Sequence, residues 1–532
     1  MSLTKLLRNK YNDSKTNKQT TLEERFVELR IQQFQLEALP NTFSDSNVEK
    51  LEELRQDSPE VPLLNLFEKM GCDKVAPRKI HITGRAGVGK STLLEYIAGE
   101  WAAKKLWCDI HYLFLIKLRQ FIQTEKWSIT DLLFGDLCMS VPDKIAAFDE
   151  IRKHSDHVII LIDGLDEYPS FKYNKFAFPE DNKVNLSDVI SNIINLKFLP
   201  KAKVLVTSQP TSKISPKEFD RVVEIYGFTK AGIKQYVRRY CADKGMDLIS
   251  FILTNITDNP NIETFCHTPV QCHFVCVSLE GRFGQSGGVP HIKTMTQLYV
   301  ETTYRLARAL HTELKGKNID FNEIFTVLKD PFLKLADLAK TNYMANPSKL
   351  IFYDKDLRDH DISDMDIKTK FLLCSKEMVP DSFENYRNSW SFSHLTLQQF
   401  FAALALLRDT GSSSDMAKIC ESRASVIKYD MVITFLAGLL GDPNRKNKEY
   451  LTSLGIENAS LDKCREFINL LKPNLGGNPL KLLTLVFESQ RKKLIESLPE
   501  KFKTSKMCAM EMMSLCWVVE QKTCQIISIE KV

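Results

Sequence analysis

Five short apolar segments alternate with polar, helix-like segments between Arg78 and about Thr229. They are Ile80–Thr83, His111–Ile116, His157–Ile162, Lys203–Thr207 and Val222–Ile225. Short runs rich in valine and isoleucine are typical of strands that are buried on both faces of a sheet. Between the first two, Ser91 to Lys105 has apolar residues at helical spacing. This alternation predicts an α/β domain with a parallel five-stranded sheet flanked by helices.

The regions on either side of this domain have different patterns. The N-terminal region is polar and basic, with a helix predicted to begin near Thr21 at the capping-box sequence Thr21–Glu24, and a linker at Pro40–Ser46. After Thr229 the strand-like segments fade, and apolar residues recur at helical spacing. No unit of roughly 20–50 residues repeats, so the sequence predicts no leucine-rich or ankyrin-type array.

A glycine-rich loop joins the first predicted strand to the helix that follows it. Its sequence fits the pattern G-x-x-x-x-G-K-[ST] over Gly84, Arg85, Ala86, Gly87, Val88, Gly89, Lys90 and Ser91. The glycines let successive backbone N–H groups point at phosphate oxygens, and the N-terminus of the helix adds a positive dipole end. Lys90 would reach the β- and γ-phosphates of a nucleotide, Ser91 would hold Mg²⁺, and Thr92 would lie near the α-phosphate. Because the loop stands between a strand and a helix, a phosphate-binding loop is favoured over a chance glycine turn.

A cluster of acidic residues follows the third predicted strand. The strand ends in Asp163, which the geometry of a parallel sheet delivers to the same edge as the glycine loop, where it would bind Mg²⁺. Glu167 is placed to orient or deprotonate an attacking water, with Asp166 as its alternative or helper. Taken alone, the cluster also fits a solvated acidic loop. Together with the glycine loop, it predicts a nucleoside triphosphatase.

These motifs and several further segments resemble the NACHT family of STAND (signal-transduction) P-loop NTPases, of the NOD-like-receptor type. The matching segments are the paired-acid motif Asp163–Glu167, the sensor strand Lys203–Pro210, the exit from the core Glu224–Thr229, the helical segment Phe265–Val270 and the winged-helix signature Trp390–Ala402. They follow the order of the family, and the resemblance covers Arg78 to about Leu440. Leucine-rich repeats are not recognisable.

The resemblance implies the domain organisation and the remaining site residues. It implies an N-terminal helical and linker region, a P-loop NTPase core, a helical domain, a winged-helix domain and a C-terminal helical domain, at 1–74, 75–228, 229–300, 301–410 and 411–532. In the family, the proline that matches Pro269 packs on the adenine, and the histidine that matches His394 touches the β-phosphate of ADP. The family further implies that ADP holds these domains closed, and that exchange for ATP opens them and permits oligomerisation.

One position departs from the pattern of the family. Gln209 stands where the family usually has an arginine. A neutral amide can donate a hydrogen bond to the γ-phosphate, but it stabilises less developing charge than a guanidinium does. We therefore expect nucleotide binding with weak ATP hydrolysis. Arg85, inside the glycine loop, would partly compensate, unless it faces solvent.

Composition and charge indicate which partners and which cellular location are expected for the protein. The chain has 532 residues, of which 43% are hydrophobic, and a net charge of +5, so no global field attracts nucleic acid or a membrane surface. No apolar segment is long enough to span a membrane, and the basic N-terminus lacks the apolar core of a secretory signal. The 13 cysteines have no regular spacing, which predicts reduced thiols and a cytoplasmic location.

Two further clusters invite binding roles. Three cysteines and two histidines lie between Cys266 and Cys276 and could hold a metal ion, although their spacing fits one buried side of a helix better. Basic residues between Arg491 and Lys506 could bind phosphate or acidic lipid, although a solvated helix face fits them better.

The sequence therefore predicts a cytoplasmic molecular switch that binds ATP, ADP and Mg²⁺ and has weak ATPase activity. Nucleotide exchange would drive domain opening and self-association in innate-immune-like or defence signalling. Two alternatives stay open: a constitutively cycling P-loop ATPase, and a protein-interaction module that nucleotide stabilises. The activating ligand, the downstream effector and the oligomeric state are not specified by the sequence.

Overall fold

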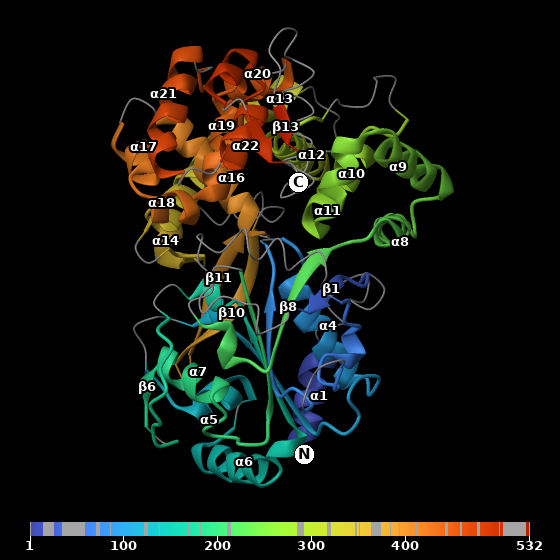
Figure 1. Cartoon of the computed structure of the whole chain (residues 1–532), viewed down its shortest axis with the longest axis vertical. Coiled ribbons are helices and arrows are strands. Elements are labelled where there is room, and N and C mark those ends of the chain that lie inside the picture. The colour runs from blue at the N-terminus through green and yellow to red at the C-terminus, as the bar shows by residue number, and fades with distance from the viewer. Residues whose placement is uncertain are drawn as a thin grey trace. The chain divides into compact units, whose positions relative to one another are not determined.

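Two units make up the structure of the chain, which is a computed structural model (Figure 1). The first unit comprises Met1–Ala242, His267–Pro269 and Met378–Arg387, and the second comprises Asp243–Cys266, Val270–Glu377 and Asn388–Val532. The structure describes residues 2–13, 26–33, 59–70, 75–85, 87–121, 126–137, 139–168, 171–180, 182–209, 214–284, 292–315, 321–345, 348–350, 352–362, 374–382, 385–392, 394–409, 413–441, 445–457, 460–475, 479–498, 501–503 and 528–530.

A six-stranded sheet in the order β1-β8-β2-β7-β5-β3 forms the centre of the first unit (Figure 1). Five of its strands run parallel to one another and confirm the five predicted segments: β2 (Lys79–Thr83), β3 (Tyr112–Lys117), β5 (Val158–Asp163), β7 (Lys203–Ser208) and β8 (Arg221–Gly227). Every residue of β5 is buried, as expected for a strand with both faces covered. The strand that leads to the glycine loop, β2, therefore lies beside β7, and β7 lies beside β5.

The sixth strand, β1 (Arg30–Gln33), runs antiparallel to β8 at the edge of the sheet. The prediction of an all-parallel five-stranded sheet is therefore wrong at this edge. Buried Val27, Leu29 and Ile31 alternate with exposed residues, which is the period of a strand with one buried face. The polar composition of the N-terminal region obscured this short pattern. The predicted helix start at Thr21 and the predicted linker lie outside the described residues.

Helices cover both faces of this sheet. They are α1 (Leu3–Asp13), α4 (Lys90–Ala102), α5 (Ile129–Phe134), α6 (Val141–Lys153), α7 (Leu186–Ile194) and α8 (Lys230–Tyr240), and the short strands β4 (Lys126–Trp127) and β6 (Val184–Asn185) pair separately. In Figure 1, α1 and α4 lie on one side of the strands and α5 and α7 on the other. Leu94, Ile97 and Trp101 of α4 are fully buried where this helix contacts β3, β5 and β7. This packing fixes the start of α4, which the glycine loop enters.

The second unit is mainly helical, as its sequence predicts. Its helices are α9 (Met246–Asp258), α10 (Pro260–Cys266), α11 (Pro269–Glu280), α12 (Met295–Lys315), α13 (Phe321–Met344), α14 (Asp354–Arg358), α16 (Leu395–Arg408), α17 (Ser413–Cys420), α18 (Arg423–Lys428), α19 (Asp430–Leu439), α20 (Arg445–Ser453), α21 (Leu461–Leu471) and α22 (Pro479–Ser489). Every residue from Thr396 to Leu407 is buried, because α12, α13 and α19 pack around α16.

A three-stranded sheet in the order β10-β11-β9 lies in sequence between α13 and α16. Its strands are β9 (Phe352–Tyr353), β10 (Cys374–Ser382) and β11 (Asn385–Phe392), and a parallel pair, β12 (Lys501–Lys503) and β13 (Ser528–Glu530), follows α22. The sequence pattern did not predict these strands. β11 pairs antiparallel with β9, and such strands need only alternate apolar residues, so they lack the continuous apolar runs of the first sheet. The winged-helix assignment of this region stays a prediction.

Candidate functional site

The glycine loop leaves the carboxyl end of β2 and enters α4. Gly87 and Gly89 have φ angles of 77° and 102°, in a region that residues with a β-carbon rarely adopt. A β-carbon at Gly84 would lie 2.8 Å from Cγ1 of Val88, so the loop closes tightly on itself. Because α4 begins directly after Gly89, the first N–H groups of the helix face the loop. This geometry suits a phosphate group.

Lys90 lies over the glycine loop. Its Nζ donates to the carbonyl oxygens of Gly84 at 2.6 Å and Arg85 at 3.0 Å. These bonds hold the ammonium group beside the loop, and its contact with the β- and γ-phosphates of a nucleotide stays a prediction. The Arg85 side chain is exposed, which fits the solvent-facing alternative. In the first turn of α4, Ser91 is half-buried and Thr92 is exposed.

Asp163 ends β5 and has only 2% of its surface exposed. Thr207 Oγ1, on the neighbouring strand β7, donates to Asp163 Oδ1 at 2.8 Å and accepts from the backbone N–H of Gly164 at 2.9 Å. The carboxylate is therefore held in place at the end of its strand. A carboxylate here and the hydroxyl of Ser91 are hard oxygen donors, which Mg²⁺ prefers. The residues present thus fit the predicted Mg²⁺ site.

The acidic turn after β5 contacts the residue that follows β7. The backbone N–H of Gln209 donates to Asp166 Oδ1 at 2.9 Å. Asp166 lies in the short 3-10 turn Leu165–Glu167, so this bond fastens that turn to the end of β7. The sequence did not reveal this holding role of Asp166. Ala86 of the glycine loop and the side chain of Glu167, the other candidate base, lie outside the described residues.

The segment that carries Pro269 packs against the end of β8. Gly227 has a φ angle of 94°, and a β-carbon there would collide with the carbonyl oxygen of His267. The backbone N–H of Phe228 donates to the His267 carbonyl oxygen at 2.8 Å, and His267 Nδ1 lies 2.7 Å from the Phe228 carbonyl oxygen. These contacts leave Pro269 Cγ 3.8 Å from the position that a β-carbon would take on Gly89. The structure therefore brings Pro269 to the glycine loop.

An N-terminal segment that the sequence analysis did not single out also reaches the loop. Leu29 Cδ1 lies 3.1 Å from the same β-carbon position on Gly89. The ring of Phe26 stacks on Tyr96 of α4, with ring centroids 3.8 Å apart, and the Arg239 guanidinium donates to the Phe26 carbonyl oxygen. Leu29 and Pro269 thus form an apolar wall beside the loop. The alternating burial of residues 27–31 is the signal that could have found this segment.

His394 stands at the N-terminal cap position of α16, in the second unit. Its ring meets Phe274 edge-on, with centroids 5.8 Å apart. Since the glycine loop belongs to the first unit, contact between His394 and a bound phosphate stays a prediction.

The three cysteines of this cluster are buried: Cys266 in α10, and Cys272 and Cys276 in α11. This agrees with the prediction that their spacing fits the buried side of a helix. Burial raises the pKa of the Cys276 thiol well above its usual value, so this group stays protonated. Within the described ranges, no three His, Cys, Asp or Glu side chains are grouped as metal ligands. None of the described helices combines the length and the apolar composition that a bilayer crossing requires.

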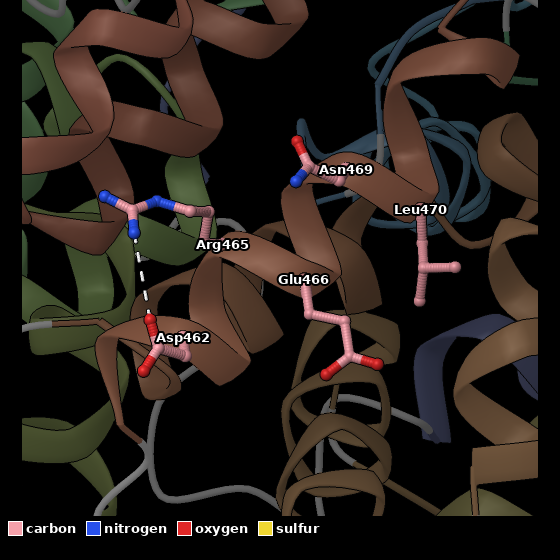
Figure 2. A pocket seen from close by; sticks show the side chains of 5 residues that line it. All are labelled: Asp462, Arg465, Glu466, Asn469 and Leu470. Carbon is pink, nitrogen blue, oxygen red and sulfur yellow. Dashed lines mark ion pairs between the residues drawn. The ribbon is translucent and has the colours of Figure 1, made fainter.

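An open hollow on the surface of the second unit is lined by one face of α21. Figure 2 shows its lining residues: Asp462, Arg465, Glu466, Asn469 and Leu470. Arg465 forms an ion pair with Asp462 at 3.7 Å, and the Asp462 side chain is 90% exposed, so solvent screens the pair. The hollow has neither a glycine loop nor a buried acid, and we assign it no nucleotide role.

A parallel sheet with a phosphate-type glycine loop after one strand and a buried aspartate at the end of a nearby strand defines the class of P-loop NTPases. The family model described as "NACHT domain" matches residues 78–244, which contain the loop, Asp163 and Gln209. Residues 78–244 of the chain therefore form a NACHT domain.

Curated relatives match more than half of the chain. The chain is 28% identical over 411 residues to human "NACHT, LRR and PYD domains-containing protein 12", which covers 74% of this chain and 36% of that protein. It is 29% identical over 336 residues to human "NACHT, LRR and PYD domains-containing protein 3", covering 61% and 30%. The chain thus spans about a third of the length of these relatives.

Among solved structures, a STAND protein with a tetratricopeptide repeat sensor from Pyrococcus horikoshii matches 83% of this chain and 62% of that chain. The sequence identity is 12% and the TM-score is 0.29. The fold assignment therefore rests on the strand order and loop geometry of this chain.

Proposed function

We propose that this protein is a molecular switch that binds ATP and ADP and hydrolyses ATP weakly. The observation that carries the proposal is the order of three adjacent strands, β2, β7 and β5, whose carboxyl ends lead to the glycine loop, Gln209 and Asp163. With the phosphates of a nucleotide in the loop, the γ-phosphate would lie near the ends of all three strands. Such a site can distinguish ATP from ADP through contacts that only the γ-phosphate makes.

Different residues of the first unit would bind different parts of the nucleotide. The N–H groups of the loop and the Lys90 ammonium would bind the phosphates. Ser91 and Asp163 would hold Mg²⁺, which neutralises phosphate charge when it is bound. Leu29 and Pro269, which flank Gly89, form an apolar wall that suits the flat face of adenine.

Hydrolysis would use the acidic turn after β5. Glu167, with Asp166 as its helper, would orient a water whose oxygen attacks the γ-phosphorus. The bond to the β–γ bridging oxygen breaks, and the proton of the water passes to the carboxylate. Charge develops on the γ-phosphate oxygens in this step, and Gln209 offers them a neutral donor instead of a guanidinium. Turnover is therefore expected to be slow.

The second unit would convert the nucleotide state into a change of arrangement. We infer that His394, in the winged-helix region 301–410, contacts the β-phosphate of ADP and favours a closed state. Exchange for ATP would release this contact and open surfaces for self-association. The helical domain at 229–300, the C-terminal domain at 411–532, the cytoplasmic location and a role in innate-immune-like or defence signalling are parts of the same proposal.

The experiment that tests it identifies and counts the nucleotide released from freshly purified, denatured protein. Wild-type protein is compared with Lys90→Ala and His394→Ala, and with Lys153→Ala as a matched control, since Lys153 is exposed on α6. Near-stoichiometric ADP is expected in the wild type and the control. Lys90→Ala is expected to retain about tenfold less, because it loses a charge-assisted contact to phosphate.

Other outcomes favour the alternatives. Retained ATP would indicate a protein that binds without hydrolysing. An empty, folded protein that turns over added ATP rapidly would refute the switch and support a cycling ATPase. A Lys90→Ala variant that loses its fold along with its nucleotide would support a structural role for the nucleotide.

A further inference from the structure

The last residues of the sensor strand connect the two strands that carry the site. Thr207 and Ser208 end β7, and Gln209 follows directly. Thr207 bonds to the acidic strand β5, Ser208 bonds to the loop strand β2, and Gln209 bonds to the turn after β5. Each of these three positions therefore holds a different part of the site.

The bond to β2 is made by His81, which is fully buried. His81 Nε2 lies 2.8 Å from Ser208 Oγ, and Ser208 Oγ donates to the carbonyl oxygen of Gln209 at 2.7 Å. A serine hydroxyl has one proton, and here that proton goes to the carbonyl. The hydroxyl must then accept from His81, so Nε2 carries the hydrogen.

The imidazole is fixed in orientation and in charge. The ring of Phe219 stacks on it, with centroids 4.7 Å apart and an angle of 26° between the planes. Burial lowers the pKa of His81 to about 3, so the ring is neutral near neutral pH. His81 is therefore a constant hydrogen-bond donor to Ser208.

We propose that His81 is a positioning residue for recognition of the γ-phosphate: from β2 it holds Ser208, and through Ser208 it holds the peptide of Gln209. The inference rests on the proposed nucleotide function. A neutral amide binds phosphate only through directed hydrogen bonds, so its contribution depends on orientation more than that of a charged guanidinium. ADP has no γ-phosphate, and its binding depends on the glycine loop and Lys90.

The experiment measures the affinities for ADP and for a non-hydrolysable ATP analogue, and the single-turnover rate at saturating ATP. His81→Phe keeps a ring against Phe219 and removes the donor, whereas His81→Gln returns an N–H at a similar position. Thr83→Val is the matched control, because Thr83 is also buried on β2 but donates to the Val223 carbonyl oxygen on β8, on the other side from β7.

In His81→Phe, the preference for the ATP analogue over ADP and the hydrolysis rate are each expected to fall by about tenfold, the effect of one lost hydrogen bond. The affinity for ADP should change by less than about twofold. His81→Gln should recover most of the preference, and Thr83→Val should keep it. Ser208→Ala should match His81→Phe, and the double variant should lose no more than either single variant.

Three results would count against this role. An unchanged preference in His81→Phe and Ser208→Ala, in protein that binds ADP normally, would overturn it and leave the switch standing. An equal loss of both nucleotides in His81→Phe and His81→Gln, with a lower melting temperature, would show a purely structural role. Wild-type protein that binds neither nucleotide would refute the proposed function, and this inference with it.

Discussion

Among the buried ionisable side chains, a base in the first unit and an acid in the second have pKa values that burial shifts in opposite directions. In the first unit, His81 is fully buried, and burial lowers its pKa to about 3. In the second unit, Glu488 is 2% exposed, and burial raises the pKa of its carboxyl group. Both shifts have one cause, since burial penalises the charged form of each group. A fall in pH should therefore reduce the stability that His81 contributes and increase the stability that Glu488 contributes.

The hydrogen bonds of the two groups also lead to different places. Glu488 accepts from the backbone N–H groups of Met295 at 2.9 Å and Thr296 at 3.2 Å, and from Thr296 Oγ1 at 2.9 Å. These donors lie at the start of α12, where the N–H groups have no partner within the helix. Glu488 therefore caps the N-terminus of α12. His81 instead leads to Gln209 beside the glycine loop. A buried group that binds a helix end, as Glu488 does, contributes stability. A buried group whose hydrogen bonds lead to the site, as those of His81 do, can also respond to a ligand.

The largest effect should come from removing the carboxyl group of the second unit. Glu488→Ala leaves the buried donors of Met295 and Thr296 without their acceptor and is expected to lower the free energy of unfolding by about 3 kcal/mol. Calorimetry measures the loss, and hydrogen exchange should locate it at α12 and α22. Glu466→Ala, on the exposed face of α21, is the control and should change stability by less than about 0.5 kcal/mol. A changed preference between ATP and ADP in Glu488→Ala would contradict the separation of roles.

A smaller effect should follow from lowering the pH of the wild-type protein. The pKa of His81 is lowered from 6.5 to about 3 on folding. Between these values the unfolded chain binds one more proton, so the stability is present above pH 6.5 and is lost as the pH falls toward 3. From pH 7 to pH 5 the loss is about 2 kcal/mol. Hydrogen exchange at β2 and β7, corrected for intrinsic rates, should show this loss in the wild type. If His81→Phe shows the same loss, His81 is not its source.

The parts of the fold that the sequence predicted are those whose patterns are local. In β3, β5 and β7 the apolar residues are consecutive, because both faces of each strand are covered, and they are visible without knowledge of the neighbouring strands. β1 and β11 pair antiparallel with β8 and β9, and neither contains a run of consecutive apolar residues. Such short patterns indicate a strand only when the partner strand is known, and that partner lies far away in the sequence. The sequence therefore did not predict these two strands.

The features of the site also fall into those that the local sequence predicts and those that depend on distant residues. The glycine loop and Asp163 could be predicted because left-handed glycines and a strand that ends in an acid are local requirements. The bond between His81 and Ser208 joins residues 127 positions apart, and it depends on β2 lying beside β7. Leu29 reaches Gly89 from a segment whose strand was itself missed. Strand order, which no single motif encodes, decides these contacts.

The smallest change, Glu488→Gln, tests the opposite pH responses most directly. Because the folded pKa of Glu488 is raised above its ordinary value of 4.5, stability from the neutral form is fully present below about pH 4.5 and is lost as the pH rises through the folded pKa. The charge of Lys481 favours the ionised form and limits this loss. Glutamine cannot ionise, so the slope should vanish.

At pH 5 the stability of Glu488→Gln should differ from that of the wild type by about 1 kcal/mol, since the amide keeps one acceptor oxygen for α12 and loses the other. Hydrogen exchange at α12 and α22, measured at pH 5 and pH 7 in both proteins, gives the two slopes. A slope that persists in Glu488→Gln would assign the pH response of the second unit to another group. The contrast between the units would then rest on His81 alone.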